Sequence, residues 1–139
     1  MVTTALILGP SIALGLIIGI YEALVIHRDV TVPSHRFGHM IHALVLSVLF
    51  VFVSMNTQFV ASQLSGVAIL NNVHILRIIA GLLAAIKIHG VSRAIKSTGM
   101  AGAGLAETWF HSILIGGLIT AAPYVYPYVQ TMIPAWLNW

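Results

Sequence analysis

The chain contains no cysteine, and this absence excludes several kinds of site. Without thiols the protein has no disulfide bond, no thiolate-bound zinc, no iron–sulfur cluster and no covalently attached c-type haem. A bound metal ion would therefore need ligands from histidine, glutamate, aspartate or methionine.

Charged residues are also scarce. They form 6% of the sequence, whereas an average soluble domain has about 25%. Nucleic-acid binding needs lysine and arginine clustered on a water-exposed face. The six basic and three acidic side chains are too sparse for that, so we exclude nucleic acid as a partner. No Ser/His/Asp or Cys/His nucleophile set is recognisable, and we assign no catalytic residue.

Apolar residues make up 59% of the chain, and the mean hydropathy is +1.01. Four apolar runs are long enough to cross a bilayer as helices. We therefore predict an all-α fold, an integral membrane four-helix bundle of antiparallel spans with short loops, as a single domain over residues 1–139. The predicted spans cover about residues 4–26, 35–62, 73–90 and 105–122, and an aromatic interfacial tail covers residues 123–139.

Helix-breaking and small residues define these boundaries. Ser34 can cap the second helix, Asn72 precedes the third, and Pro123 is expected to end the fourth. Gly15 and Gly19 form a small-xxx-small pattern on the first helix, which allows a neighbouring helix to approach closely.

The distribution of basic residues predicts the orientation in the membrane. Arg28, Arg36, Arg93 and Lys96 lie in or beside the 27–34 and 91–104 loops, whereas Arg77 stands alone at the opposite side. Because cytoplasmic loops carry the excess of lysine and arginine, we predict that both loops are cytoplasmic. The N- and C-termini would then lie outside, with the cell membrane as the expected location.

Histidine is abundant for so apolar a chain, with seven residues. His35, His39 and His42 stand at i, i+4 and i+7, so on a helix they form one stripe. This spacing resembles a histidine box of membrane di-iron desaturases and hydroxylases. Those enzymes carry several such boxes and more than the seven histidines present here, so we do not expect desaturase activity.

The predicted topology gathers ionisable side chains from all four helices near the cytoplasmic boundary. From them we select candidate metal ligands: Glu22, His39, His42, Glu107 and His111. Glu107 and His111 form the best pair, because i, i+4 spacing places both on one helical face.

Three interpretations of this cluster remain open. The side chains could bind a transition metal through histidine and glutamate, or two histidines could hold a b-type haem between helices. In the third interpretation the glutamates pair with Lys87 or Arg36, and the histidines hydrogen-bond to the backbone or to headgroups.

Short loops and the lack of an extramembrane domain favour a protein surrounded by other proteins. We therefore expect a small non-catalytic accessory or structural subunit of a larger membrane complex, of a redox or metal-dependent kind such as a respiratory or monooxygenase-like assembly. Its partners would be other membrane subunits, in a hetero-oligomer rather than a homo-oligomer, and lipid. The alternative is a metal- or b-haem-binding four-helix membrane protein. A small channel or transporter comes third, because no inverted repeat is present.

Overall fold

The computed structural model describes residues 6–29, 33–64, 66–97 and 109–137, with side chains outside 25–36, 38–39 and 91–97. Every regular element in these ranges is helical, so the all-α prediction is confirmed. The α-helices are α1 (Gly9–Asp29), α2 (Pro33–Met55), α3 (Thr57–Gln63), α4 (Val73–Ser97) and α5 (Trp109–Val129). Short 3-10 helices follow α3 and α5: η1 (Ala68–Asn71), η2 (Gln130–Met132) and η3 (Ala135–Leu137).

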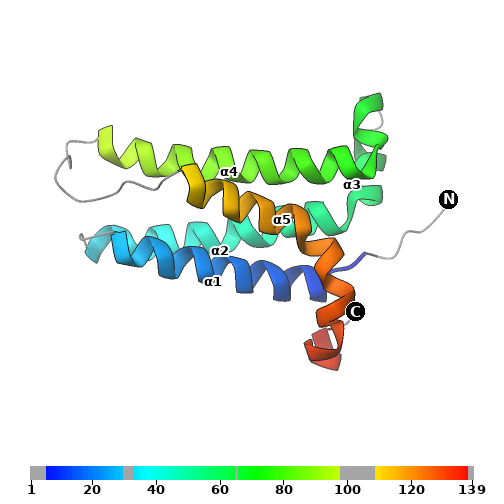
Figure 1. The fold of residues 1–139 in the computed structure, drawn as a ribbon, viewed down its shortest axis with the longest axis horizontal. Helices are drawn as coiled ribbons and strands as arrows, with labels where there is room; N and C mark the ends of the chain where they lie inside the picture. The colour runs from blue at the N-terminus through cyan, green and yellow to red at the C-terminus, as the bar shows by residue number, and fades with distance from the viewer. Residues whose placement is uncertain (1–5, 30–32, 65, 98–108, 138–139) are drawn as a thin grey trace.

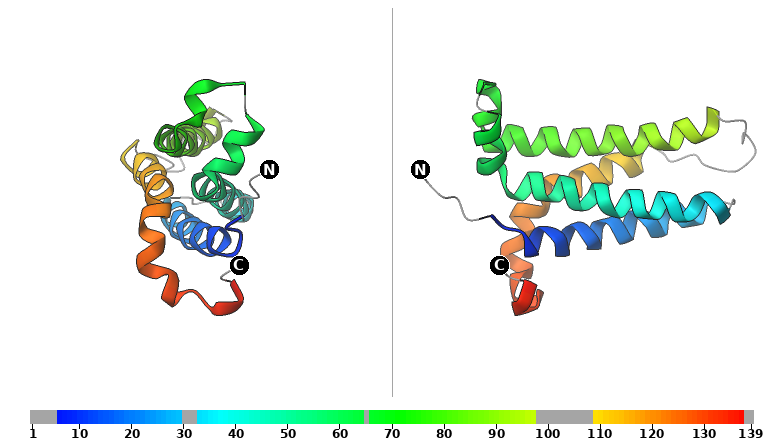
Figure 2. Two further views of the ribbon diagram at one scale, coloured as in Figure 1. Left: turned by 90° about the vertical axis from the view of Figure 1, so that its right-hand side faces the viewer. Right: turned by 180° about the vertical axis from the view of Figure 1, so that it is seen from behind.

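The four long helices lie side by side as two antiparallel pairs (Figures 1 and 2). Helix α1 packs mainly on α2, and α4 packs mainly on α5. The start of α1 and the end of α5 lie at one end of the molecule, together with α3 (Figure 1).

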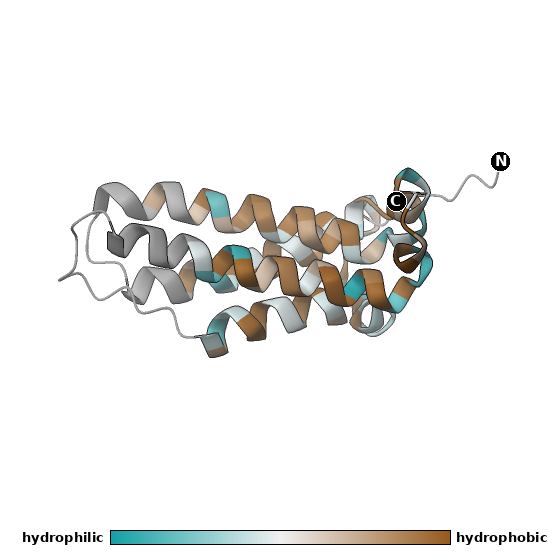
Figure 3. Cartoon of the chain, turned by 90° about the horizontal axis from the view of Figure 1, so that it is seen from above, coloured by the Kyte–Doolittle hydropathy of each residue, from teal (hydrophilic) through white to brown (hydrophobic). Residues whose placement is uncertain are grey.

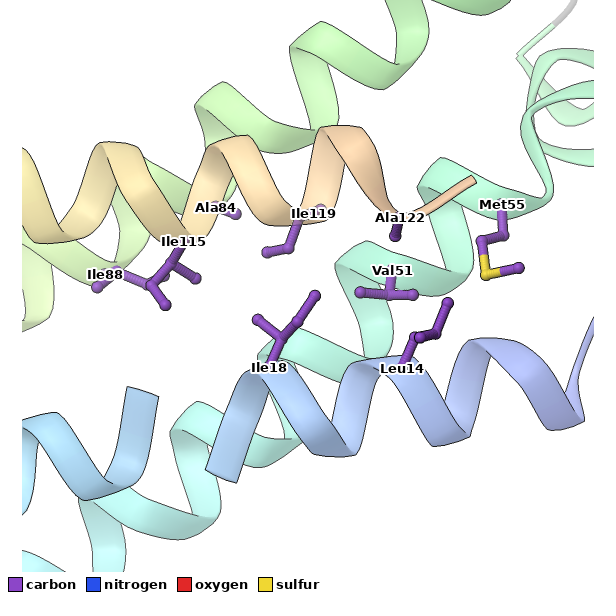
Figure 4. Close-up of a cluster of buried hydrophobic side chains, with 9 residues drawn as sticks. All are labelled: Leu14, Ile18, Val51, Met55, Ala84, Ile88, Ile115, Ile119 and Ala122. Carbon is purple, nitrogen blue, oxygen red and sulfur yellow. The ribbon is translucent and has the colours of Figure 1, made fainter. Parts of the chain in front are cut away.

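The core lies where the two pairs meet, and all four long helices contribute to it (Figure 4). Val51 of α2 and Ile115 and Ile119 of α5 have no exposed surface. The complete buried cluster comprises Leu14, Ile18, Val51, Met55, Ala84, Ile88, Ile115, Ile119 and Ala122. In a bilayer such a core is held by close van der Waals packing, because lipid tails are as apolar as these side chains.

Glycines bring the helices of each pair into close contact. A Cβ atom at Gly15 would lie 2.5 Å from Cα of Val48, and one at Gly19 would lie 2.9 Å from Cα of Leu44. The predicted close approach at Gly15 and Gly19 is therefore confirmed, with α2 as the neighbour. The second pair has a similar contact, since Gly81 of α4 and Gly116 of α5 abut each other's backbone.

Two helices in the described part of the chain are long and apolar enough to cross a membrane, Val73–Gly90 and Trp109–Met132. A third qualifies if Met40–Met55 and Thr57–Gln63 form one bent span, whereas the apolar part of α1, Gly9–Leu24, is shorter. Figure 3 shows hydrophobic residues along the helices and several hydrophilic ones at the end that carries α3. Two to three helices are thus consistent with membrane insertion.

The second helix is shorter than predicted. Instead of continuing to residue 62, α2 ends at Met55, and the chain bends by 88° before α3. Asn56 occupies the break. Its side chain forms hydrogen bonds with the carbonyl of Phe52 on α2 and with the backbone N–H of Ile7 before α1, and these bonds link the bend to both segments.

The fourth helix is longer than predicted. Helix α5 continues through Pro123 and Pro127 to Val129, so the expected stop at Pro123 is wrong. Each proline removes one backbone hydrogen bond and favours a kink, which helices in apolar surroundings tolerate when neighbours compensate. Figure 1 shows the axis of α5 turning near its end.

The first loop is also shorter than predicted. Helix α1 begins at Gly9 and extends to Asp29, and α2 begins at Pro33. Proline suits the first helical turn, where its missing N–H would have no intrahelical acceptor.

Candidate functional site

Glu22 is the buried carboxylate of the predicted site. Its side chain is 3% exposed, and the hydroxyl of Ser47 on α2 donates a 3.0 Å hydrogen bond to Oε2. In the third interpretation Glu22 pairs with Lys87 or Arg36; Lys87 is exposed and does not pair with it, and the side chain of Arg36 lies outside the described residues. The carboxylate therefore faces the neighbouring helix and is solvated by a hydroxyl group.

His111 lies on α5 and contacts α1. Its ring stacks on Tyr21 with centroids 6.2 Å apart and planes inclined by 13°. The Nε2 atom is enclosed and has no hydrogen-bond partner among the described residues. Tyr21 precedes Glu22, but successive helical residues point about 100° apart. Accordingly, the Glu22 side chain contacts α2, whereas the Tyr21 side chain, on the adjacent face of α1, contacts His111.

The remaining predicted ligands do not complete a site in the described part of the chain. His42 is exposed, while Glu107 and the side chain of His39 lie outside the described residues. Among those residues no group of three or more histidine, aspartate or glutamate side chains could hold a metal ion. The five-residue metal site therefore stays a prediction.

His89 forms an aromatic contact that the sequence does not reveal. Its ring is 7% exposed and stacks on Trp109 at the start of α5, with centroids 3.8 Å apart and planes inclined by 17°. This stack joins α4 and α5 at the end of the bundle opposite α3. The two residues are far apart in the sequence, and no spacing rule connects them.

A second polar cluster lies at the end that carries α3, and sequence reasoning missed it. Nδ1 of His74 and the hydroxyl of Tyr124 lie 2.6 Å apart. The guanidinium carbon of Arg77 lies 4.8 Å from the centroid of the Tyr124 ring, and its Nε donates a 3.3 Å hydrogen bond to the carbonyl of Ser54. His74 and Arg77 share a face of α4 at i, i+3 spacing, but no local signal points to Tyr124.

The side chain of Asn56 links α2 to α1 and to the segment before α1 through hydrogen bonds. Its Oδ1 accepts a 2.7 Å hydrogen bond from the backbone N–H of Ile7. Its Nδ2 donates to the carbonyls of Phe52 and Ile7 at 3.0 and 3.2 Å, and to the hydroxyl of Ser11 at 3.3 Å. The bend after α2 is thereby bonded to the segment that leads into α1.

Two hollows adjoin these elements. The Arg77 cavity, of about 250 Å³, is lined by Ile7, Met55, Asn56, Thr57, Gln58, Phe59, Val73 and Arg77. The α4/α5 groove, of about 430 Å³, is lined by Ile78, Gly81, Leu82, Ala85, Ile113, Gly116, Gly117, Thr120, Ala121 and Tyr124. The first has polar groups and one cation in its wall, and the second is almost wholly apolar.

Comparison of the chain with models of known protein families, with curated proteins and with solved structures finds no match in any of the three. Functional inference therefore depends on the residues and geometry described above.

Proposed function

We propose that this chain is a small non-catalytic subunit of a larger membrane protein complex, of a redox or metal-dependent kind. The α4/α5 groove carries the proposal. It is apolar, and Gly117 in its wall has no atom within 4 Å of the position that a Cβ would occupy. A side chain from a neighbouring helix could enter there, because small residues allow membrane helices to approach closely.

The helix surfaces around the groove also support a protein neighbour. Large apolar side chains are exposed on both helices, which suits either lipid or another subunit. They include Ile78, Leu82, Leu83 and Ile86 on α4, and Ile113, Leu118, Tyr124 and Val125 on α5.

For the membrane arrangement, we propose four spans: α1, the bent pair α2 and α3, α4, and α5. The 27–34 and 91–104 regions, predicted as loops although α1 reaches Asp29, α2 begins at Pro33 and α4 reaches Ser97, would be cytoplasmic and both termini outside, in the cell membrane. Two features support this arrangement. The antiparallel pairs bring the start of α1 and the end of α5 to the same end of the molecule (Figure 1), and the basic residues concentrate near the opposite end.

Co-purification from native membranes tests the subunit role. The wild-type chain should be recovered in mild detergent with other membrane proteins, and native mass analysis should give a hetero-oligomer. Gly117→Leu should lose the partner, because the new side chain fills the α4/α5 groove. Gly90→Leu is the matched control, since a Cβ at Gly90 would also have no atom within 4 Å but would lie outside the groove.

Recovery of the wild-type chain alone, or only with copies of itself, would contradict the subunit proposal. Equal partner recovery with Gly117→Leu and Gly90→Leu would show that the groove is not the contact surface.

A metal- or b-haem-binding protein is the second candidate, and the enclosed Nε2 of His111 favours it. An imidazole nitrogen of this kind is a suitable ligand for zinc, copper or iron. Elemental analysis and an absorption spectrum of the purified chain decide this case, and a colourless, metal-free sample would exclude it.

A further inference from the structure

We propose that the Arg77 cavity binds a phosphate group at the end of the molecule that carries α3. This site is separate from the α4/α5 groove and from the predicted metal ligands. The ligand is either the headgroup of a phospholipid or soluble phosphate, and both present the same oxyanion to the guanidinium.

Charge balance is the first reason. The whole sequence has three acidic residues, Glu22, Asp29 and Glu107. Glu22 accepts a hydrogen bond from Ser47 within the bundle, and Asp29 ends α1 at the opposite end of the molecule (Figure 1). Among the described residues, which do not include Glu107, no acidic side chain lines the Arg77 cavity. Because cations that are partly removed from water need an anionic partner, the half-buried Arg77 is expected to take one from outside the chain.

The orientation of Arg77 is the second reason. Its Nε is held by the carbonyl of Ser54 at 3.3 Å, and its guanidinium lies over the ring of Tyr124, which His74 contacts in turn. Besides Nε, the guanidinium has two terminal nitrogens that can donate to a ligand. A guanidinium held in one plane offers parallel N–H donors that match two oxygens of a phosphate.

The cavity itself is the third reason. Its volume of about 250 Å³ is several times the roughly 30 Å³ that one water molecule occupies in the liquid. Thr57 and Gln58, at the start of α3, add a hydroxyl and a carboxamide to the wall, and apolar side chains such as Ile7 and Phe59 form other parts of it. A phosphate at Arg77 would thus have neutral donors nearby and an apolar surface for the group that it esterifies.

The bend after α2 makes this arrangement possible. Thr57, Gln58 and Phe59 are the first residues of α3, which turns 88° away from the direction of α2. A straight second helix would carry these residues away from the start of α4, where Val73 and Arg77 lie. The bend held by Asn56 therefore brings the two walls of the cavity together.

Lipid binding by the full-length chain in detergent tests the proposal. Native mass spectrometry should show that the wild type binds dioleoylphosphatidylglycerol at least about tenfold more tightly than dioleoylglycerol, which has the same tails and no phosphate. Inorganic phosphate should compete with the phospholipid. This comparison needs no variant, so it is independent of any effect of mutation on folding.

Variants assign the binding to the cavity. Arg77→Gln should weaken binding of the phospholipid by about tenfold, because the charged donors are lost. Lys87→Gln is the matched control, since it removes an exposed cation from the same helix, and it should bind as the wild type does. Circular dichroism should show equal helical content for all three proteins.

The outcomes separate clearly. Saturable binding of inorganic phosphate without preference for the phospholipid over dioleoylglycerol would support a phosphate site and identify the soluble ligand as its source. Equal binding of the two lipids together with no effect of inorganic phosphate would overturn the proposal, as would an Arg77→Gln variant that binds the phosphate ligand of the wild type with unchanged affinity.

Discussion

At the scale of single residues, some buried polar side chains in this protein have their hydrogen-bond partner on a neighbouring helix. Glu22 and Ser47 show this most clearly, because a carboxylate on α1 receives a hydroxyl from α2. Leaving a buried acceptor without its donor costs more than the bond contributes on its own. This hydrogen bond therefore helps to fix the rotation of α1 about its own axis relative to α2.

Ser47→Ala should lower the free energy of unfolding by about 1–2 kcal/mol, because it removes the donor to the Glu22 carboxylate. Chemical denaturation in detergent measures this change. The same substitution in a Glu22→Leu background should cost less, and the difference gives the coupling energy of the pair.

Ser112→Ala provides the control for this serine. The hydroxyl of Ser112 is buried and has no hydrogen-bond partner among the described residues, so its removal should leave the stability nearly unchanged or raise it. Equal decreases in the free energy of unfolding for Ser47→Ala and Ser112→Ala would show that the hydrogen bond to Glu22 does not stabilise the protein.

At the scale of helices, the two antiparallel pairs are built in the same way. In each pair glycines remove side-chain bulk where two helices meet: Gly15 and Gly19 on α1, and Gly81 and Gly116 across α4 and α5. Thr120 adds a bond across the second contact, since its hydroxyl lies 3.3 Å from the carbonyl of Arg77 on α4, and it lies 3.0 Å from the carbonyl of Gly116 on its own helix. Close packing of backbones is thus the common stabilising device.

Gly116→Ala should destabilise the protein by about 1–3 kcal/mol, because the added methyl group meets the backbone of Gly81 and must push α4 and α5 apart. Gly117→Ala changes the next residue in the same way, but its Cβ would enter open space. Thermal denaturation should show a lower midpoint for the first variant only. Equal shifts for both would mean that helix propensity, rather than the contact, sets the stability.

At the scale of the whole molecule, hydrophobic residues run along the helices, and several hydrophilic residues lie at the end that carries α3 (Figure 3). One end carries Asn56, Arg77 and the bend into α3. Toward the other end lie the Glu22–Ser47 bond and the His89–Trp109 stack. This division suits a molecule whose two ends meet different surroundings.

The proposed orientation predicts the accessibility of each end. Because the chain has no native cysteine, single cysteines can report on it without background. Ala103→Cys, in the predicted cytoplasmic loop, should react with an impermeant thiol reagent only from the cytoplasmic side. Gly66→Cys, at the exposed position between α3 and η1, should react only from outside. Reversed labelling would contradict the orientation.

The sequence alone determined the helical character, the long apolar segments and the close approach at Gly15 and Gly19. These features follow from local physics, because a helix satisfies its backbone polar groups within one segment and its small residues are visible directly. Helix ends were less predictable. Pro123 did not stop α5, and Asn56 ended α2, because in both cases the surrounding packing and side-chain bonds decide how the backbone is satisfied.

Only the tertiary structure decided which polar side chains meet. Glu22 contacts Ser47 rather than Lys87, and Tyr124 joins Arg77 and His74 from a helix about fifty residues away in the sequence. Such contacts depend on the rotation of each helix about its axis and on the bend between α2 and α3. Successive residues of a helix point about 100° apart. Periodicity can therefore place a side chain on one face of its helix, but it does not identify the element that this face contacts.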